Sequence, residues 1–193
     1  MKEKKEKKRW GLMVFIIFIM IGTSFSVIFF GFAPPGRNTI KYNGISFVSN
    51  QNFWTAKING AEAAFTYLPM DVQEINLSPD IQQKLQNKFE LDTTSEANSS
   101  FKESIALAQH EMGLTLSAYN IYLRKGFTAN NTFKLPVIAC KDATEAVPVI
   151  YFRQGNATRI ASEGSCIIAE ASTNPDFIRM KDRLLYSILG VLK

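Results

Sequence analysis

The first feature of the chain is a long apolar stretch that no charged side chain interrupts. Residues 10–32 contain no Asp, Glu, Lys or Arg over 23 positions. A helix of that length covers the roughly 30 Å hydrocarbon core of a bilayer, so the stretch predicts a transmembrane signal anchor. A cleaved secretory signal peptide is the alternative interpretation, although this apolar run is longer than the core of such a peptide.

Beyond the apolar stretch, the pattern changes to short apolar runs separated by turn-forming residues. Two Asn-Gly pairs, Asn43-Gly44 and Asn59-Gly60, each lie between β-prone runs, which is typical of two-residue hairpins. Residues 38–69 are therefore predicted to form an antiparallel meander. Further strands are predicted from runs rich in β-branched and apolar residues, over 89–94, 135–140, 146–153, 156–161 and 165–171.

Three stretches show instead the spacing of apolar positions that an amphipathic helix requires. They cover residues 77–89, 99–120 and 174–193. The run 146–152 is apolar on both alternating faces, so it is predicted to be a central strand that needs cover on both sides, and the last helix provides part of that cover. This order of elements predicts an α+β (or mixed α/β) domain built around one sheet.

The net charge of +5 is concentrated at the start of the chain. Residues 1–9 hold six Lys and Arg against two Glu, which leaves 16 basic and 15 acidic residues for the rest. Because these basic residues precede the apolar stretch, the positive-inside rule places them in the cytoplasm and the domain outside. A nearly neutral domain lacks the basic patch that nucleic-acid binding requires, so no nucleic acid is expected as a partner.

These features predict a single-pass membrane protein with its N-terminus in the cytoplasm and its C-terminal domain extracytoplasmic. Its expected parts are a basic cytoplasmic tail, a transmembrane signal anchor, a linker and an extracytoplasmic α+β domain, over residues 1–9, 10–32, 33–39 and 40–193.

Cys140 and Cys166 are the only cysteines of the chain. Outside the cytoplasm thiols are not kept reduced, so an even number of cysteines predicts a disulfide. Period-2 alternation places Cys140 on one strand face with Ile138, and Cys166 on one with Ile168, which favours a bond between inward-facing strand ends. A redox pair or a catalytic thiol is the alternative, but redox pairs usually have C-x-x-C spacing and 25 residues intervene here.

Four N-x-S/T triplets are candidate N-glycosylation sites. Each falls in a predicted turn or at the boundary of a predicted element, where a glycan would not disturb the core. The four asparagines are Asn76, Asn98, Asn130 and Asn156.

Residues with catalytic or metal-binding chemistry form no complete motif, so no catalytic residue, metal or cofactor is assigned. The single histidine, His110, lies in half of an H-E-x-x-H zinc motif, and Leu114 stands where the second histidine should be. Asp92 and Glu96 are candidates for a carboxylate pair. The charged residues of the last helix are predicted to form a solvated face, and they are Arg179, Lys181, Asp182 and Arg183.

Several short segments accompany the basic tail and the single anchor: C-K-D-A-T, P-V-I, S-C-I-I and the terminal K-D-R-L-L-Y-S-I-L-G-V. This arrangement resembles uncharacterised archaeal single-anchor membrane proteins of unknown function. The resemblance implies a placement in the membrane, and it carries no active-site residues across.

The sequence thus favours a non-enzymatic, membrane-anchored domain that binds or supports a partner in the cell envelope. Expected partners are the lipid bilayer and another envelope protein, contacted through the outer domain or through the anchor, where Gly22 and Ser26 offer a small-residue face. Two alternatives stay open. One is an envelope enzyme, either a carboxylate-dependent hydrolase or a thiol-disulfide protein. The other is a pilin-like filament subunit, which would need an acidic residue where Ile16 stands.

Overall fold

The computed structural model describes residues 11, 13–16, 19 and 38–192, and it divides into two units, Met1–Asn38 and Thr39–Lys193. In the first unit, residues 11, 13–16 and 19 are helical, Asn38 is in no regular element, and all of these residues are exposed. Among the described residues, no helix is both long enough and apolar enough to span a membrane. The predicted tail, most of the predicted anchor, and Gly22 and Ser26 lie outside the described residues.

The second unit begins with the predicted meander, a four-stranded antiparallel sheet in which each strand pairs with the next. Its tight turns contain the two Asn-Gly pairs, and Asn43 and Asn59 have φ values of 47° and 48°. Positive φ at both central residues is the geometry that two-residue hairpins need, which explains why Asn-Gly predicted them correctly. The strands are β1 (Thr39–Tyr42), β2 (Ile45–Asn50), β3 (Phe53–Ile58) and β4 (Ala61–Phe65).

A second sheet of five strands follows, in the order β6-β5-β7-β9-β8, with only β8 antiparallel to its neighbour. The prediction of a single sheet is therefore wrong, although the mixed α+β class is confirmed. Residues 135–140 do not form a strand, since Val137 makes only an isolated bridge with Phe127 and Cys140 begins a 3-10 turn. The strands are β5 (Glu90–Ser95), β6 (Tyr122–Lys125), β7 (Val149–Gln154), β8 (Arg159–Glu163) and β9 (Cys166–Ala171).

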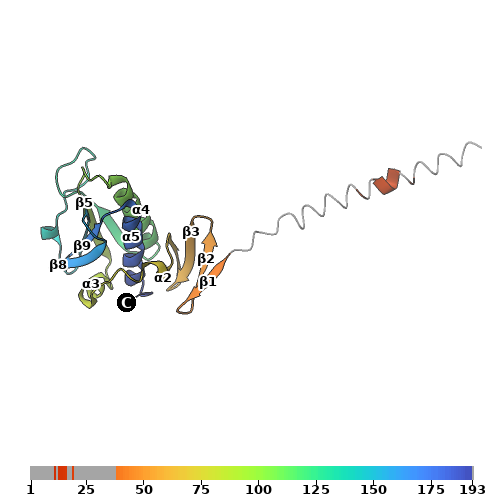
Figure 1. Ribbon diagram of the computed structural model, residues 1–193, viewed down its shortest axis with the longest axis horizontal. Helices are drawn as coiled ribbons and strands as arrows, with labels where there is room; N and C mark the ends of the chain where they lie inside the picture. The colour runs from red at the N-terminus through yellow and green to blue at the C-terminus, as the bar shows by residue number, and fades with distance from the viewer. Residues whose placement is uncertain (1–10, 12, 17–18, 20–37, 193) are drawn as a thin grey trace, which may run out of the picture. The chain divides into compact units, whose positions relative to one another are not determined.

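Helices α4 and α5 lie between the two sheets. Figure 1 shows α4 and α5 in the middle, with the five-stranded sheet on one side and the meander on the other. The three predicted helices are present, and a fourth, of four residues, was not predicted because it is too short to show a periodic pattern. The helices are α2 (Pro69–Val72), α3 (Pro79–Leu85), α4 (Lys102–Ser117) and α5 (Asn174–Ile188).

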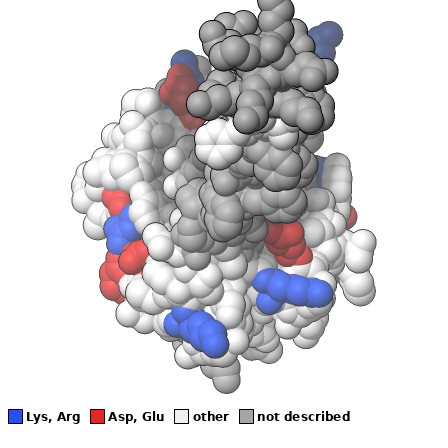
Figure 2. Space-filling view, turned by 90° about the vertical axis from the view of Figure 1, so that its right-hand side faces the viewer, with Lys and Arg blue, Asp and Glu red and all other residues white. Residues whose placement is uncertain are grey.

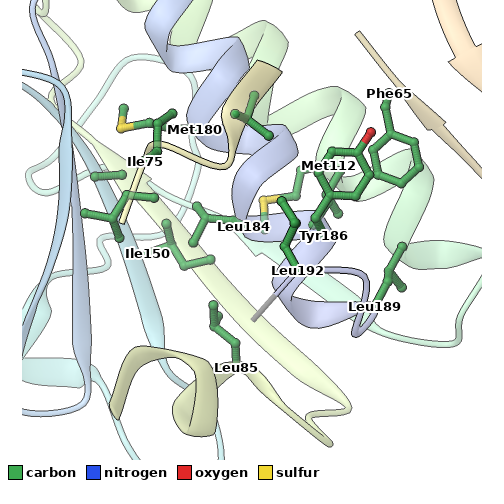
Figure 3. Close-up of a cluster of buried hydrophobic side chains, with 14 of the residues drawn as sticks. Phe65, Ile75, Leu85, Met112, Ile150, Met180, Leu184, Tyr186, Leu189 and Leu192 are labelled. Carbon is green, nitrogen blue, oxygen red and sulfur yellow. The ribbon is translucent and has the colours of Figure 1, made fainter. Parts of the chain in front are cut away.

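The core forms on both sides of α5, as Figure 3 shows. Leu184 is fully buried and lies toward Ile150 of β7 in that view. On the meander side, the ring of Tyr186 stacks on that of Phe65 with centroids 4.2 Å apart, and its hydroxyl donates a hydrogen bond to the Tyr67 carbonyl oxygen. Because both faces of α5 bury large side chains, this helix joins the two sheets into one core.

The outer face of the five-stranded sheet is covered by a connection instead of a helix. Residues 127–139, which we name the flap, fold back so that the Phe127 amide donates to the Pro136 oxygen and the Ile138 amide donates to the Phe127 oxygen. Gly126 permits this close return, since a Cβ there would lie 2.7 Å from Pro136 O. Ile138 is then buried against this outer face.

Candidate functional site

The disulfide predicted between Cys140 and Cys166 is present, and it fastens the end of the flap to β9. The Cα atoms of the two residues lie 5.1 Å apart. Cys166 is fully buried and packs with Ile138 and Val149 on the outer face of the sheet. Since both sulfurs belong to this bond, neither cysteine is available as a nucleophile in this state.

A polar cavity of about 490 Å³ lies at the amino edge of the five-stranded sheet, where β7 and β9 begin. Three segments form its walls: α3 with the residue Lys88 that follows it, the loop before β7, and the turn between β8 and β9. The disulfide flanks two of these walls, because the loop follows Cys140 and the turn ends at Cys166. The lining residues are Asp80, Gln83, Lys84, Lys88, Thr144, Glu145, Pro148, Gly164 and Ser165.

Hydrogen bonds across the cavity hold its walls together. Asp80 accepts from Lys84 Nζ at 2.5 Å and from Ser162 Oγ at 2.7 Å. These bonds, with that of Lys84 the stronger, lower the pKa of the Asp80 carboxyl, so it stays ionised. Lys88 Nζ donates to the Glu145 carbonyl oxygen at 2.6 Å. The two ammonium groups and two carboxylates balance, so the cavity offers donors and acceptors without attracting an ion of one sign.

Two aromatic side chains stand exposed at the same edge. Phe89 follows Lys88 and is 86% exposed, and Tyr122 at the start of β6 is 63% exposed. The Tyr122 amide donates to the Phe89 carbonyl oxygen at 2.8 Å, so the two residues are neighbours across the start of the sheet. An exposed phenylalanine is not itself unusual, but paired aromatic residues beside a polar cavity are typical of a binding surface.

The sequence did not indicate this surface. Phe89 stands between a predicted helix and a predicted strand, where either element could have buried its ring. The residues that line the cavity are also spread over three separate segments, from Asp80 to Ser165, with no common motif.

The charged residues of α5 are not solvated as predicted, because α4 and the segment 66–75 after the meander contact them. The Lys181 side chain is 1% exposed, and its Nζ lies 2.6 Å from Asp182 Oδ1 and 2.9 Å from Glu111 Oε2. Asp182 Oδ2 accepts hydrogen bonds from the backbone amides of Thr66 and Tyr67, at 2.9 and 2.8 Å. Burial raises the pKa of Asp182 to about 6, against the opposing effect of Lys181.

The two arginines of α5 also bond to backbone oxygens of α2 and of the residues that follow it. Arg183 is buried and its Nε donates to the Ile75 oxygen at 2.9 Å. Arg179 donates to the Asp71 oxygen at 3.1 Å and pairs with Asp176 and Glu74. These contacts attach the 71–75 segment to α5, and they are structural.

The candidate carboxylate pair is not brought together. Asp92 lies in β5 and Glu96 follows the end of that strand, four residues on, which is about 13 Å along an extended chain, against about 5 to 10 Å for a catalytic pair. Asp92 is buried and forms a two-pronged ion pair with Arg124, at 2.8 and 2.6 Å. Glu96 accepts a hydrogen bond from the Tyr151 hydroxyl at 2.9 Å, and burial together with this bond raises the pKa of Tyr151 to about 12.

A third set of charges lies where β7 and β9 end. Glu170 pairs with Arg159 of β8 and with Arg153 of β7, the latter at 2.6 Å. The hydrogen bond from Arg159, and then that from Arg153, lower the pKa of the Glu170 carboxyl. The Glu170 carboxylate thus has two arginine partners, which is the arrangement of a structural network.

His110 is exposed on α4. Within the part of the chain that the structure describes, no three His, Cys, Asp or Glu side chains are grouped so that they could hold a metal ion. The four sequon asparagines are all exposed and outside helices and strands.

Charge on the meander side of the molecule is dispersed. Figure 2 shows this side, where visible basic and acidic side chains lie next to one another at the left, with no broad area of one sign among the described residues in view. Comparison of the chain with protein-family models, with curated proteins and with solved structures gave no match.

Proposed function

We propose that this protein is a membrane-anchored, non-enzymatic domain that acts outside the cytoplasm and binds another protein of the cell envelope. Its binding surface is the amino edge of the five-stranded sheet, which consists of Phe89, Tyr122 and the polar cavity beside them. The observation that carries the proposal is the 86% exposure of Phe89, which directly follows Lys88 in the wall of a cavity that the disulfide flanks.

The placement outside the cytoplasm is supported by the chain's own pattern. Six basic residues precede 23 uncharged positions, and the domain after them contains a disulfide. Disulfides persist in oxidising compartments and are rare in the cytosol. Six residues lie between the apolar stretch and Thr39, which is a span of at most about 20 Å for an extended chain.

The chemistry of the amino edge favours a protein over a lipid surface. Lysines near the exposed aromatics would suit anionic headgroups only if they outnumbered the acids. Here the charges of Lys84 and Lys88 are balanced by those of Asp80 and Glu145. An aromatic anchor with a mixed, polar rim matches the usual anatomy of a protein interface.

The flap is a second exposed apolar segment, with Phe133, Leu135 and Val137 at its surface. We do not place the interface there, because the Asn130 sequon precedes Phe133 by only three residues. Phe133 is instead a useful control, since it is an exposed phenylalanine away from the amino edge.

The placement is tested on membranes that contain the full chain. Thiols are counted after denaturation, with and without reductant, and external protease is added to intact cells. We expect both cysteines to be blocked until reduction and the domain to be accessible from outside. Free thiols on a domain that only lysis exposes to protease would contradict the placement.

The interface is tested by placing a photoreactive amino acid at position 89 in intact cells, with position 133 as the matched control. We expect one protein to cross-link at 89 and not at 133. The cross-linked protein is then purified, and its affinity for the domain is measured directly. Phe89→Ser should weaken that affinity about tenfold or more, as for an aromatic hot spot, and Phe133→Ser should leave it unchanged. Equal cross-linking at both positions, or equal affinities of both variants, would refute the assignment.

A further inference from the structure

The sequons gather at one edge of the five-stranded sheet. Strands β5, β6 and β7 are parallel, so their carboxyl ends meet at one edge. Beyond β6 the ladder continues, because the Thr128 amide donates to the Ser95 oxygen at 3.0 Å, and Ser95 pairs with Phe152 of β7. Ser95, Thr128 and Phe152 thus lie side by side near this edge. A sequon asparagine follows each of them within four residues, and the three are Asn98, Asn130 and Asn156.

The fourth sequon reaches the same edge from the segment before α3. Asn76 and Ser78 line a cavity of about 430 Å³ together with Thr158 and Arg159. Thr158 supplies the hydroxyl of the Asn156 sequon, and Arg159 begins β8 beside the end of β9. Two sequons therefore share this cavity, and all four lie at the carboxyl edge.

The four acceptor amides are accessible. Each asparagine is exposed and lies outside helices and strands. Within the described part of the chain, none of the four side chains makes a hydrogen bond, whereas the neighbouring Asn131 bonds to the Leu135 backbone through both of its side-chain atoms. The amino edge, with Phe89 and its cavity, contains no sequon.

We propose that Asn76, Asn98, Asn130 and Asn156 are N-glycosylated, and that their glycans form a cap over the carboxyl edge which leaves the amino edge bare. This proposal rests on the proposed placement of the domain outside the cytoplasm. It deepens the proposed function, because the glycans direct protein contacts to the opposite edge, where Phe89 lies.

The reaction needs one co-reactant, an oligosaccharide linked to a polyprenyl phosphate or diphosphate. The asparagine Nδ2 forms a bond to C1 of the first sugar, and the bond from C1 to the phosphate oxygen breaks. The phosphate oxygen keeps the electron pair of that bond, and the amide releases one proton to solvent. No oxidant or reductant takes part.

Occupancy is tested on the full chain purified from membranes of its native host. We expect an intact mass well above 21.7 kDa and sugar on all four sequon peptides. Thr132→Ala should remove only the glycan of Asn130, and the matched Thr132→Ser variant should keep it, since serine also completes the sequon. Sugar on three or four of the sites supports the proposal, and sugar on two or fewer overturns it.

The position of the cap is tested by acylating lysines. Lys102 lies at the start of α4, four residues after Asn98, with its side chain 61% exposed. Lys57 of β3 is exposed on the meander and serves as the control. We expect Lys102 to react several-fold more slowly before removal of the glycans than after it, and Lys57 to react equally in both states. Equal rates at Lys102 would overturn the cap.

The same preparations separate failure of this proposal from failure of the proposed placement. A disulfide-bonded domain that is accessible from outside but has bare asparagines overturns only the glycan cap. A reduced domain that lysis alone exposes overturns both.

Discussion

Removal of the disulfide should destabilise the domain by an amount that the length of the closed loop sets. Cys140 and Cys166 are 26 residues apart, so in the chain-entropy model the bond removes roughly 3.5 kcal/mol of conformational freedom from the unfolded state. For a domain of about 150 residues this corresponds to a fall in Tm of about 7 to 14 °C. The double variant Cys140→Ala, Cys166→Ala keeps the buried β9 position apolar, so that the loss of the bond dominates the effect.

The measurement is urea unfolding of the purified protein, followed by circular dichroism, with and without reductant. The wild type should lose stability when reductant is added, and the double variant should be equally unstable in both buffers. Hydrogen exchange should locate the largest loss of protection in the flap and in the loop before β7, because the bond fastens both. A double variant within 1 kcal/mol of the wild type, or flap protection that reductant leaves unchanged, would refute the reasoning.

Two further parts of the structure give predictions. Because burial raises the pKa of Asp182 from 3.8 to about 6, the folded state binds its proton more tightly than the unfolded state. The free energy of unfolding should therefore fall by roughly 3 kcal/mol as pH rises from about 4 to 6. Urea titrations across this range should show the fall in the wild type, whereas Asp182→Asn should give a flatter curve; an equally steep curve would contradict the assignment. Gly126→Ala should cost about 1 to 3 kcal/mol, since its Cβ would meet Pro136 O at 2.7 Å. Gly113→Ala is the matched control, because its Cβ has 3.6 Å to the nearest atom, and as a helix-interior change it should stabilise by about 0.5 to 1 kcal/mol in thermal melts. Equal effects of the two glycine changes would show that the flap does not return as closely as described.

Local chemistry predicted much of the fold. The Asn-Gly pairs specified both hairpins of the meander, because asparagine and glycine accept the positive φ that such turns require. Apolar spacing found α4 and α5, and the compartment inferred from the N-terminal pattern led to the disulfide. Each of these features depends on residues that are close in sequence or on a property of the whole chain.

The features that were missed depend on contacts between distant segments. The amide partners of Asp182, at Thr66 and Tyr67, lie 116 and 115 residues away in the chain. The sequence around Lys181 does not show whether the charged face of α5 is covered by other segments of the chain or by water. The single-sheet prediction failed for the same reason, since the meander pairs only within itself and meets the rest through side chains. The amino-edge cavity likewise forms only when three separate segments meet.

The position of α5 determines when the domain can fold. This helix is the last element of the second unit, and both sheets pack on it. Its buried Lys181–Asp182 ion pair lies on the meander side of the core. A chain that ends at β9 lacks the helix on which both sheets pack, so we expect it not to fold. Under the proposed placement outside the cytoplasm, the chain would therefore cross the membrane extended and fold after α5 has crossed. A shortened chain that ends before Asn174 should remain sensitive to protease in limited proteolysis, whereas the full chain should resist it.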